Sequence, residues 1–134
     1  MSAEDPIRRT LALYPKRHDN RDAAGYAALF AENGRFVGAN NASHAGRAAI
    51  KQFIVDLYAT QPANRRTKHL CGNSLIDIHG ETAEAETDFV AYERLGDAPW
   101  QVHTIGRYFD RLVREEGEWR FAERRVVTGP GSLS

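Results

Sequence analysis

The chain has 134 residues, with 18 Lys and Arg against 18 Asp and Glu, so its formal net charge is zero. Proteins that bind nucleic acid usually carry a basic excess, which argues against a nucleic-acid partner. Cys71 is the one cysteine, so an internal disulfide is excluded. The sequence contains no run of about 18 apolar residues, the length needed to cross a membrane.

We expect one domain over residues 1–134, because this length is typical of a single domain and no repeat divides the chain. Loose ends are expected at about residues 1–4 and 128–134. The first residues lack the apolar stretch of a secretory signal, so we expect a soluble, cytoplasmic protein without membrane contact.

A first helix is predicted to begin near Asp5. A capping residue followed by Pro6 is typical of a helix N-terminus. Apolar side chains then recur at helical spacing: Ile7, Leu11 and Tyr14. Pro15 should kink this helix or change its hydrogen bonding before residues 18–20.

Two further helices are predicted. One covers about residues 22–31 and ends at Asn33-Gly34, and a short strand or extended bridge follows at 35–38. After a polar loop at 39–45, a third helix is expected over residues 47–59. Its apolar side chains are spaced by three and four residues, the period of one buried helical face: Ile50, Phe53, Ile54 and Leu57.

The second half of the chain predicts four strands in hairpin order, at residues 67–79, 82–94, 100–114 and 118–127. In the second of them acidic residues alternate with small ones, so one face should meet water and the other a packed layer. The acidic set is Glu84, Glu86 and Asp88, and the small set is Ala83, Ala85 and Thr87. Helices followed by an antiparallel sheet predict an α+β domain with a cavity between the two layers.

Asp19 and His69 are the candidates for chemistry. A carboxylate beside an imidazole can accept its Nδ1 proton and stabilise the imidazolium that forms when the other nitrogen removes a proton from a substrate. Each residue also has a structural interpretation: His69 as a histidine bonded within a strand, and Asp19 as the N-cap of the second helix. The sequence does not by itself bring the two together.

No metal ion and no cofactor are expected. The histidines, acidic residues and Cys71 show no spacing that fixes two metal ligands on one element. The glycines form neither a dinucleotide-binding nor a phosphate-loop pattern.

Motifs along residues 6–127 resemble the SnoaL-like branch of the nuclear transport factor 2-like superfamily. They comprise Tyr14, the segment His18-Asp19-Asn20-Arg21-Asp22, and residues 28–36, 46–50, 69–73, 106–110 and 117–121. The resemblance implies a cone-shaped α+β barrel, in which three N-terminal helices pack in a strongly curved, mostly antiparallel sheet around a deep apolar pocket.

Within that superfamily the chain looks closest to the group of scytalone dehydratase, bile acid dehydratase and hexachlorocyclohexane dehydrochlorinase. In that group a histidine acts as base and an aspartate is its partner, and His69 and Asp19 stand at the matching positions. The resemblance implies a cofactor-independent lyase or isomerase for an apolar cyclic substrate, such as a polyketide, steroid or aromatic intermediate. The alternative is a non-catalytic ligand-binding or accessory domain.

Four further residues are expected to contact the substrate if that resemblance extends to the pocket. Tyr14, His18, Asn73 or Tyr108, or a water held by them, would polarise a carbonyl or protonate a departing oxygen. Packing roles are the alternative for the tyrosines, a bulge for Asn73, and an exposed helix end for His18. His103 is out of step with its strand neighbours and is expected to point away from the pocket unless a bulge intervenes.

A homodimer is expected as well. Dimers are common among the relatives that the resemblance indicates, and Trp100, Trp119 and Phe121 would supply apolar contact on the open face of the sheet.

Overall fold

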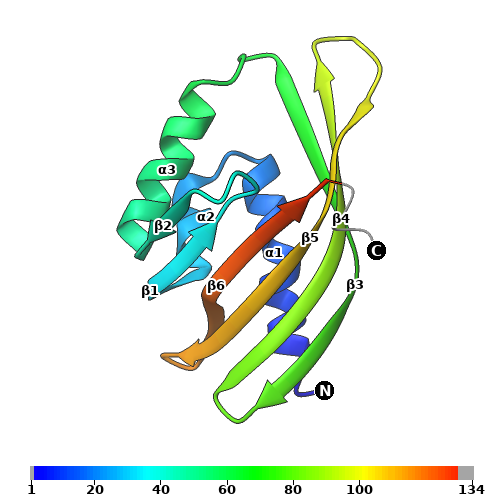
Figure 1. Ribbon diagram of the computed structural model, residues 1–134. Coiled ribbons are helices and arrows are strands. Elements are labelled where there is room, and N and C mark those ends of the chain that lie inside the picture. The colour runs from blue at the N-terminus through cyan, green and yellow to red at the C-terminus, as the bar shows by residue number, and fades with distance from the viewer. Residues whose placement is uncertain (1, 130–134) are drawn as a thin grey trace.

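The computed structural model describes residues 2–129, and within them it contains three helices and six strands (Figure 1). The helices are α1 (Asp5–Asp19), α2 (Ala23–Ala28) and α3 (Arg47–Ala59). The strands are β1 (Phe30–Val37), β2 (Ser43–Ala45), β3 (Arg65–His79), β4 (Thr82–Leu95), β5 (Gln101–Glu115) and β6 (Glu118–Thr128). None of these helices is both long and apolar enough to span a membrane.

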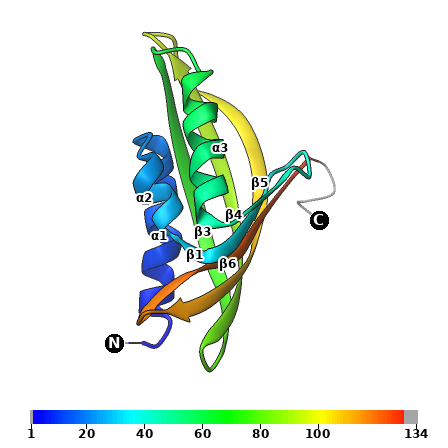
Figure 2. The same cartoon turned by 90° about the vertical axis from the view of Figure 1, so that its left-hand side faces the viewer.

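The six strands form one sheet in the order β2-β1-β6-β5-β4-β3. Neighbouring strands are antiparallel except β1 and β6, which run parallel. The sheet bends strongly around the helices, which lie on its concave side (Figure 2). The predicted α+β fold with a curved, mostly antiparallel sheet is therefore confirmed, although the sheet stays open and does not close into a barrel.

The strands β3 to β6 occur where the sequence predicts them, within about two residues at each end. Along β4 the expected alternation is present, with Ala83, Ala85 and Thr87 buried against the helices and Glu84 and Glu86 exposed. The period of two therefore identified the inner face of the sheet correctly.

The second helix is shorter than expected, because α2 ends at Ala28 and the next residues join β1. Phe30 pairs with Phe121 of β6, and the Phe121 amide donates to the Leu29 carbonyl at 2.8 Å. Gly34 lies inside β1, where a β-carbon would stand 2.7 Å from the Phe121 carbonyl oxygen. The glycine thus permits close packing of two strands and does not end a helix.

One other local prediction is corrected. The polar loop at 39–45 contains the short strand β2, which pairs with β1. The helix α1 includes Pro15, which has no backbone N–H to donate, and extends to Asp19. Of the expected loose ends, residues 1 and 130–134 lie outside the described part of the chain. Ser2 is placed, and its amide donates to Asp5 Oδ2 at 3.0 Å.

The core fills the space between the helices and the concave face. Its fully buried apolar side chains come from all three helices and from the neighbouring strands β1, β6 and β5: Ile7, Tyr26, Phe30, Ile50, Ile54, Leu112 and Phe121. The expectation that Phe121 lies on an exposed face of the sheet is therefore wrong, and Trp119 also packs against the core. Only Trp100 of the three proposed contact residues is largely exposed, at 46%. Cys71 is exposed.

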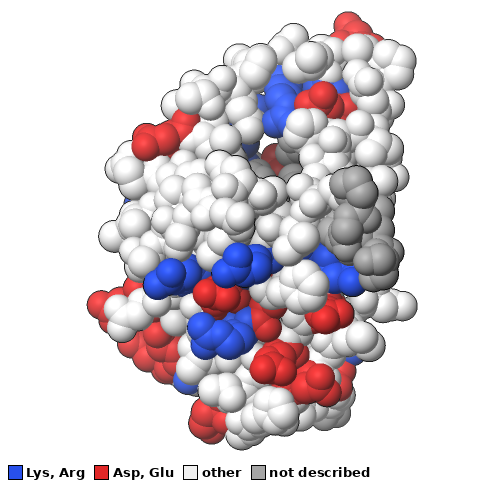
Figure 3. Space-filling view, viewed as in Figure 1, with Lys and Arg blue, Asp and Glu red and all other residues white. Residues whose placement is uncertain are grey.

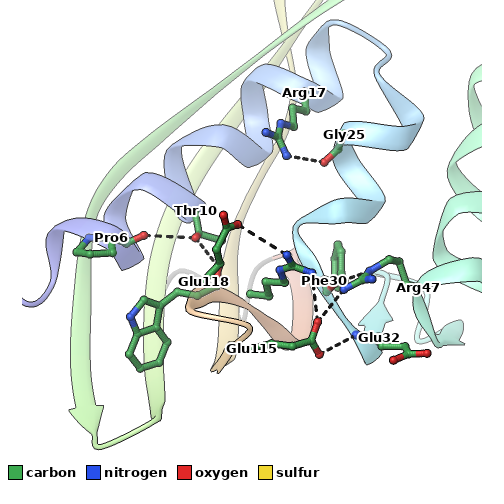
Figure 4. Close-up of polar contacts among 11 residues, drawn as sticks. Pro6, Thr10, Arg17, Gly25, Phe30, Glu32, Arg47, Glu115 and Glu118 are labelled. Carbon is green, nitrogen blue, oxygen red and sulfur yellow. Dashed lines mark hydrogen bonds and ion pairs between the residues drawn. The ribbon is translucent and has the colours of Figure 1, made fainter.

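Polar contacts join the helices to the β5–β6 hairpin (Figure 4). The Thr10 hydroxyl donates to the Trp119 carbonyl at 2.7 Å. Glu115 accepts from Arg47 Nη2 at 2.8 Å and from the Glu32 amide at 3.1 Å. These bonds link α1, α3 and β1 to one hairpin, so the helical layer is fastened to the sheet at this end.

A buried ion pair lies beneath the helices. Arg124 on β6 donates from Nε and Nη2 to the two carboxylate oxygens of Asp110 on β5, each at 2.8 Å. The two side chains are 1% and 0% exposed. The guanidinium carbon also lies 3.8 Å from the ring centre of Tyr108, 4.2 Å from that of Tyr14 and 4.3 Å from that of Phe121.

We expect Asp110→Asn to lower the free energy of unfolding by about 3 kcal/mol, because it leaves Arg124 buried without a counter-charge. The control is Asp88→Asn, which breaks a second Asp–Arg pair of the same sheet, with Arg107, but at a side chain that is 63% exposed. That change should cost less than about 1 kcal/mol. Urea unfolding of the two variants measures the difference, and equal losses would contradict the prediction.

Candidate active site

A cavity of about 470 Å³ lies between the helices and the concave face of the sheet and opens to solvent. Figure 3 shows the hollow, with basic and acidic atoms side by side at its rim. Two stacked aromatic pairs line it. Phe36 and Phe53 have ring centres 5.6 Å apart, and those of Phe89 and Tyr108 are 4.2 Å apart with nearly parallel planes. The volume lies in the usual range for small-molecule sites.

Asp19 and His69 meet at the wall of this cavity. Asp19 Oδ1 lies 2.6 Å from His69 Nδ1 and accepts a hydrogen bond from the Thr67 hydroxyl at 2.9 Å. Its second oxygen, Oδ2, accepts from the backbone amide of His69 at 2.8 Å. Thr67 belongs to the site although the sequence analysis did not single it out.

Local structure explains why these groups converge. The helix α1 ends at Asp19, and the chain then turns through Arg21, whose φ of 54° is in the left-handed region. On β3, Thr67 and His69 are two residues apart and so lie on the same face, the one toward the helices. Lys68 between them is exposed on the other face. A helix end and a strand face thus supply the two halves of the pair.

The carboxylate of Asp19 is held in its ionised form. Burial by itself would raise its pKa, but the hydrogen bonds from the His69 ring, the His69 amide and the Thr67 hydroxyl outweigh burial and lower the pKa below its ordinary value. An ionised carboxylate can only accept, so Nδ1 of His69 carries a proton and Nε2 is the basic nitrogen of the neutral ring. Nε2 makes no hydrogen bond to any residue of 2–129, and the ring lines the cavity.

His18 lies beside the pair, with its ring centre 4.8 Å from that of His69. Its Nδ1 lies 2.8 Å from the Tyr58 hydroxyl. Burial lowers the pKa of His18 to about 3, with a further lowering by His69. The ring is therefore neutral at pH 7, so the alternative of an imidazolium at a helix end is wrong. His18 instead lines the cavity, as the other interpretation expected. The contact with Tyr58 could not be read from the sequence.

Both tyrosines singled out in the sequence also line the cavity. The Tyr14 hydroxyl lies 2.8 Å from that of Tyr26, and burial raises the pKa of Tyr14 to about 12. Burial likewise raises the pKa of Tyr108. The hydroxyl of Tyr108 makes no hydrogen bond to the described residues, so it is a proton donor available to a ligand.

Bulges in the sheet correct two predictions. The pairing of β3 and β4 shifts between Cys71 and Ser74, and Asn73 in this bulge lines a separate depression of about 180 Å³. It does not reach the main cavity, where a substrate contact was expected. Between β4 and β5 the register shifts at Ala91, and His103 becomes the extra residue. His103 therefore lines the main cavity, contrary to the strict period of two.

Within residues 2–129 no three His, Cys, Asp or Glu side chains are arranged to hold a metal ion. Polar side chains at the cavity that could contact a ligand include His69 with its partner Asp19, the neutral ring of His18 and the hydroxyl of Tyr108.

The family model of the SnoaL-like domain matches residues 1–125 of the chain. Among solved structures, Rv3472 from Mycobacterium tuberculosis, a protein of unknown function, is 28% identical with a TM-score of 0.80, covering 92% of this chain and 70% of that one. A candidate scytalone dehydratase from Novosphingobium aromaticivorans is 28% identical with a TM-score of 0.79, covering 92% and 82%. A nuclear transport factor 2-like protein with a cystatin-like fold from the same organism is 25% identical with a TM-score of 0.81, covering 96% and 83%. No curated protein matches the chain.

The lowered pKa of His18 predicts a loss of stability in acid. In the unfolded chain its imidazole takes up a proton below its ordinary pKa of 6.5, whereas the folded ring stays neutral down to about pH 3. The free energy of unfolding is therefore highest above about pH 7, and it falls by about 1–2 kcal/mol between about pH 7 and pH 5. Urea unfolding should show this slope in the wild type and a flatter one in His18→Gln, whereas His79→Gln at an exposed site should keep the wild-type slope. An unchanged slope in His18→Gln would contradict the neutral ring.

Proposed function

The chain belongs to the SnoaL-like domain family, and within it we propose a cofactor-independent lyase or isomerase, most simply a dehydratase, for small apolar cyclic molecules. The observation that carries this proposal is the hydrogen bond between Asp19 and His69 at the wall of an aromatic cavity. A pair of this kind, with one nitrogen held and the other open to the cavity, is the arrangement of a general base.

In the proposed reaction, Nε2 of His69 takes a proton from a carbon next to a carbonyl group. The electron pair of that C–H bond forms a double bond to the neighbouring carbon, whose hydroxyl leaves and departs as water after gaining a proton. The imidazolium formed on His69 is stabilised by the negative charge of Asp19. In an isomerisation the same proton would return to a different carbon of the substrate.

The oxygen atoms of the substrate need partners during this step. The Tyr108 hydroxyl and the neutral ring of His18 supply them, because both line the cavity and neither carries a charge at pH 7. A donor placed where negative charge develops lowers the barrier more than one that binds the substrate alone. Tyr14 is engaged with Tyr26 and would act mainly by packing.

The cavity wall supports the proposed substrate class. The stacked pairs of Phe36 with Phe53 and Phe89 with Tyr108 favour a flat ring system. The likeness to a candidate scytalone dehydratase at 28% identity supports dehydration of such a ring. A bicyclic aromatic or polyketide-derived ketone with a hydroxyl on the β-carbon combines these features.

We expect the wild type to accelerate both deuterium exchange next to the carbonyl of 3-hydroxy-1-tetralone and its dehydration to 1-naphthol. His69→Ala should reduce both rates by about 10² to 10⁴, since general-base catalysis contributes that much. Asp19→Asn should reduce them by up to about 10⁴, because an amide no longer holds the imidazole in the required tautomer. Proton NMR follows the exchange, and ultraviolet absorbance follows the naphthol.

The control is His79→Ala, on the same strand but at its exposed end, which should keep full activity. Full activity in both His69→Ala and Asp19→Asn would overturn the proposal. Tight binding of the ketone without exchange or dehydration would also do so, and would favour the non-catalytic binding domain.

We further propose a homodimer through the outer face of the sheet. Leu70, Val90 and Ile105 lie in register across β3, β4 and β5, and Leu70 and Ile105 are 51% and 43% exposed. Light scattering should give a dimer mass for the wild type and a monomer mass for Ile105→Arg, because a charge in an apolar contact is costly. Lys51→Glu on the exposed face of α3 should leave the dimer intact, and a monomeric wild type would contradict the proposal.

A further inference from the structure

The charged groups of the cavity wall are unevenly distributed. Among the described residues that line it are two arginines, Arg21 and Arg65, but no aspartate and no glutamate. An apolar ligand would need no cation at this wall. The imbalance therefore indicates that the ligand brings a negative charge of its own.

One of the two arginines is already neutralised. Arg65 Nε donates to Glu93 at 2.9 Å, and the same carboxylate lies 3.6 Å from His103. The carboxylate of Asp19 is also fully bound, because both of its oxygens accept hydrogen bonds from β3. Neither carboxylate is left to pair with Arg21.

Arg21 forms no ion pair with any carboxylate of residues 2–129. Its Nη2 donates only to neutral oxygens, at 2.9 Å to the Arg65 carbonyl, 3.4 Å to the Pro62 carbonyl and 3.5 Å to the Gln61 side chain. These bonds hold one nitrogen of the guanidinium and leave Nε and Nη1 without a partner among the described residues. The cation is thus held in place before a ligand arrives, which reduces the entropy lost on binding.

We propose that the ligand of this cavity carries a carboxylate, that Arg21 binds it, and that the ring system of the same ligand packs against Phe89 and Tyr108. The free N–H groups at Nε and Nη1 can each donate to a carboxylate oxygen, and such charge-assisted hydrogen bonds are stronger than neutral ones. The proposal rests on the proposed function in one respect only, namely that this cavity is the substrate site. It narrows the substrate class to an aromatic or cyclic keto acid.

The test compares two ligands of the same shape, 2-naphthoate and 2-naphthamide, by isothermal titration near neutral pH. The wild type should bind the carboxylate about tenfold to 100-fold more tightly than the amide, the usual effect of a hydrogen bond to a charged group. Arg21→Gln should abolish this preference, and Arg21→Lys should keep part of it because the charge remains.

Arg66→Gln is the matched control. Arg66 also donates only to backbone carbonyls, those of Ala63 and Arg65, but it is not among the residues that line the cavity. The Arg66→Gln variant should prefer 2-naphthoate over 2-naphthamide as strongly as the wild type does. If Arg21→Gln does not fold, the intermediate preference of Arg21→Lys decides the question.

His69→Ala separates this inference from the proposed reaction, since it should remove turnover and keep the preference for 2-naphthoate. Equal binding of the two ligands by the wild type, or binding of neither, overturns the proposal. Loss of the preference in Arg65→Gln but not in Arg21→Gln overturns it as well.

Discussion

The carboxylate of Asp19 is the group on which the arrangement of this molecule depends. It ends α1 and accepts three hydrogen bonds from β3, so it joins the helical layer to the sheet. A partly buried charge is costly unless such donors compensate it, which means that the helix end and the strand must stay in register for the fold to be stable. The same three bonds fix the tautomer of His69 and leave Nε2 open to the cavity. One set of hydrogen bonds therefore both joins the two layers and orients the His69 ring toward the cavity.

An adjoining part of the cavity wall is held by a different kind of interaction. The guanidinium of Arg124 lies against the rings of Tyr14 and Tyr108 and is neutralised by Asp110. Because the pair is buried and bidentate, the two rings have little freedom to shift. Phe89 stacks on Tyr108, and both residues line the cavity. The aromatic part of the cavity wall is thus supported by a buried charged pair.

Residue patterns predict most of this fold. Periodicity identified α1, α3 and the strands β3 to β6, and the family resemblance identified His69 and Asp19, which composition and spacing could not bring together. The errors share one cause, since each was decided by a partner distant in sequence. Parallel pairing of Phe30 with Phe121 converted a predicted helix into β1. Shifts in strand register moved His103 into the cavity and left Asn73 outside it. The contacts of Thr67 and Arg21 depend on where β3 crosses the end of α1, which no local pattern encodes.

The end of α1 explains how opposite charges can stand two residues apart without neutralising each other. After the left-handed turn at Arg21, its guanidinium donates to the backbone oxygens of Pro62, before β3, and of Arg65, the first residue of β3. Asp19 is instead bound by Thr67 and His69, further along that strand. If β3 did not saturate the carboxylate, Asp19 would be the natural partner of Arg21, and both charges would be lost to a ligand. The strand thus separates a negative group that is bound to the ring of His69 from a positive group that makes no ion pair with the described residues. Both groups come from the end of α1 and the turn that follows it, and His69 and Arg21 both line the cavity.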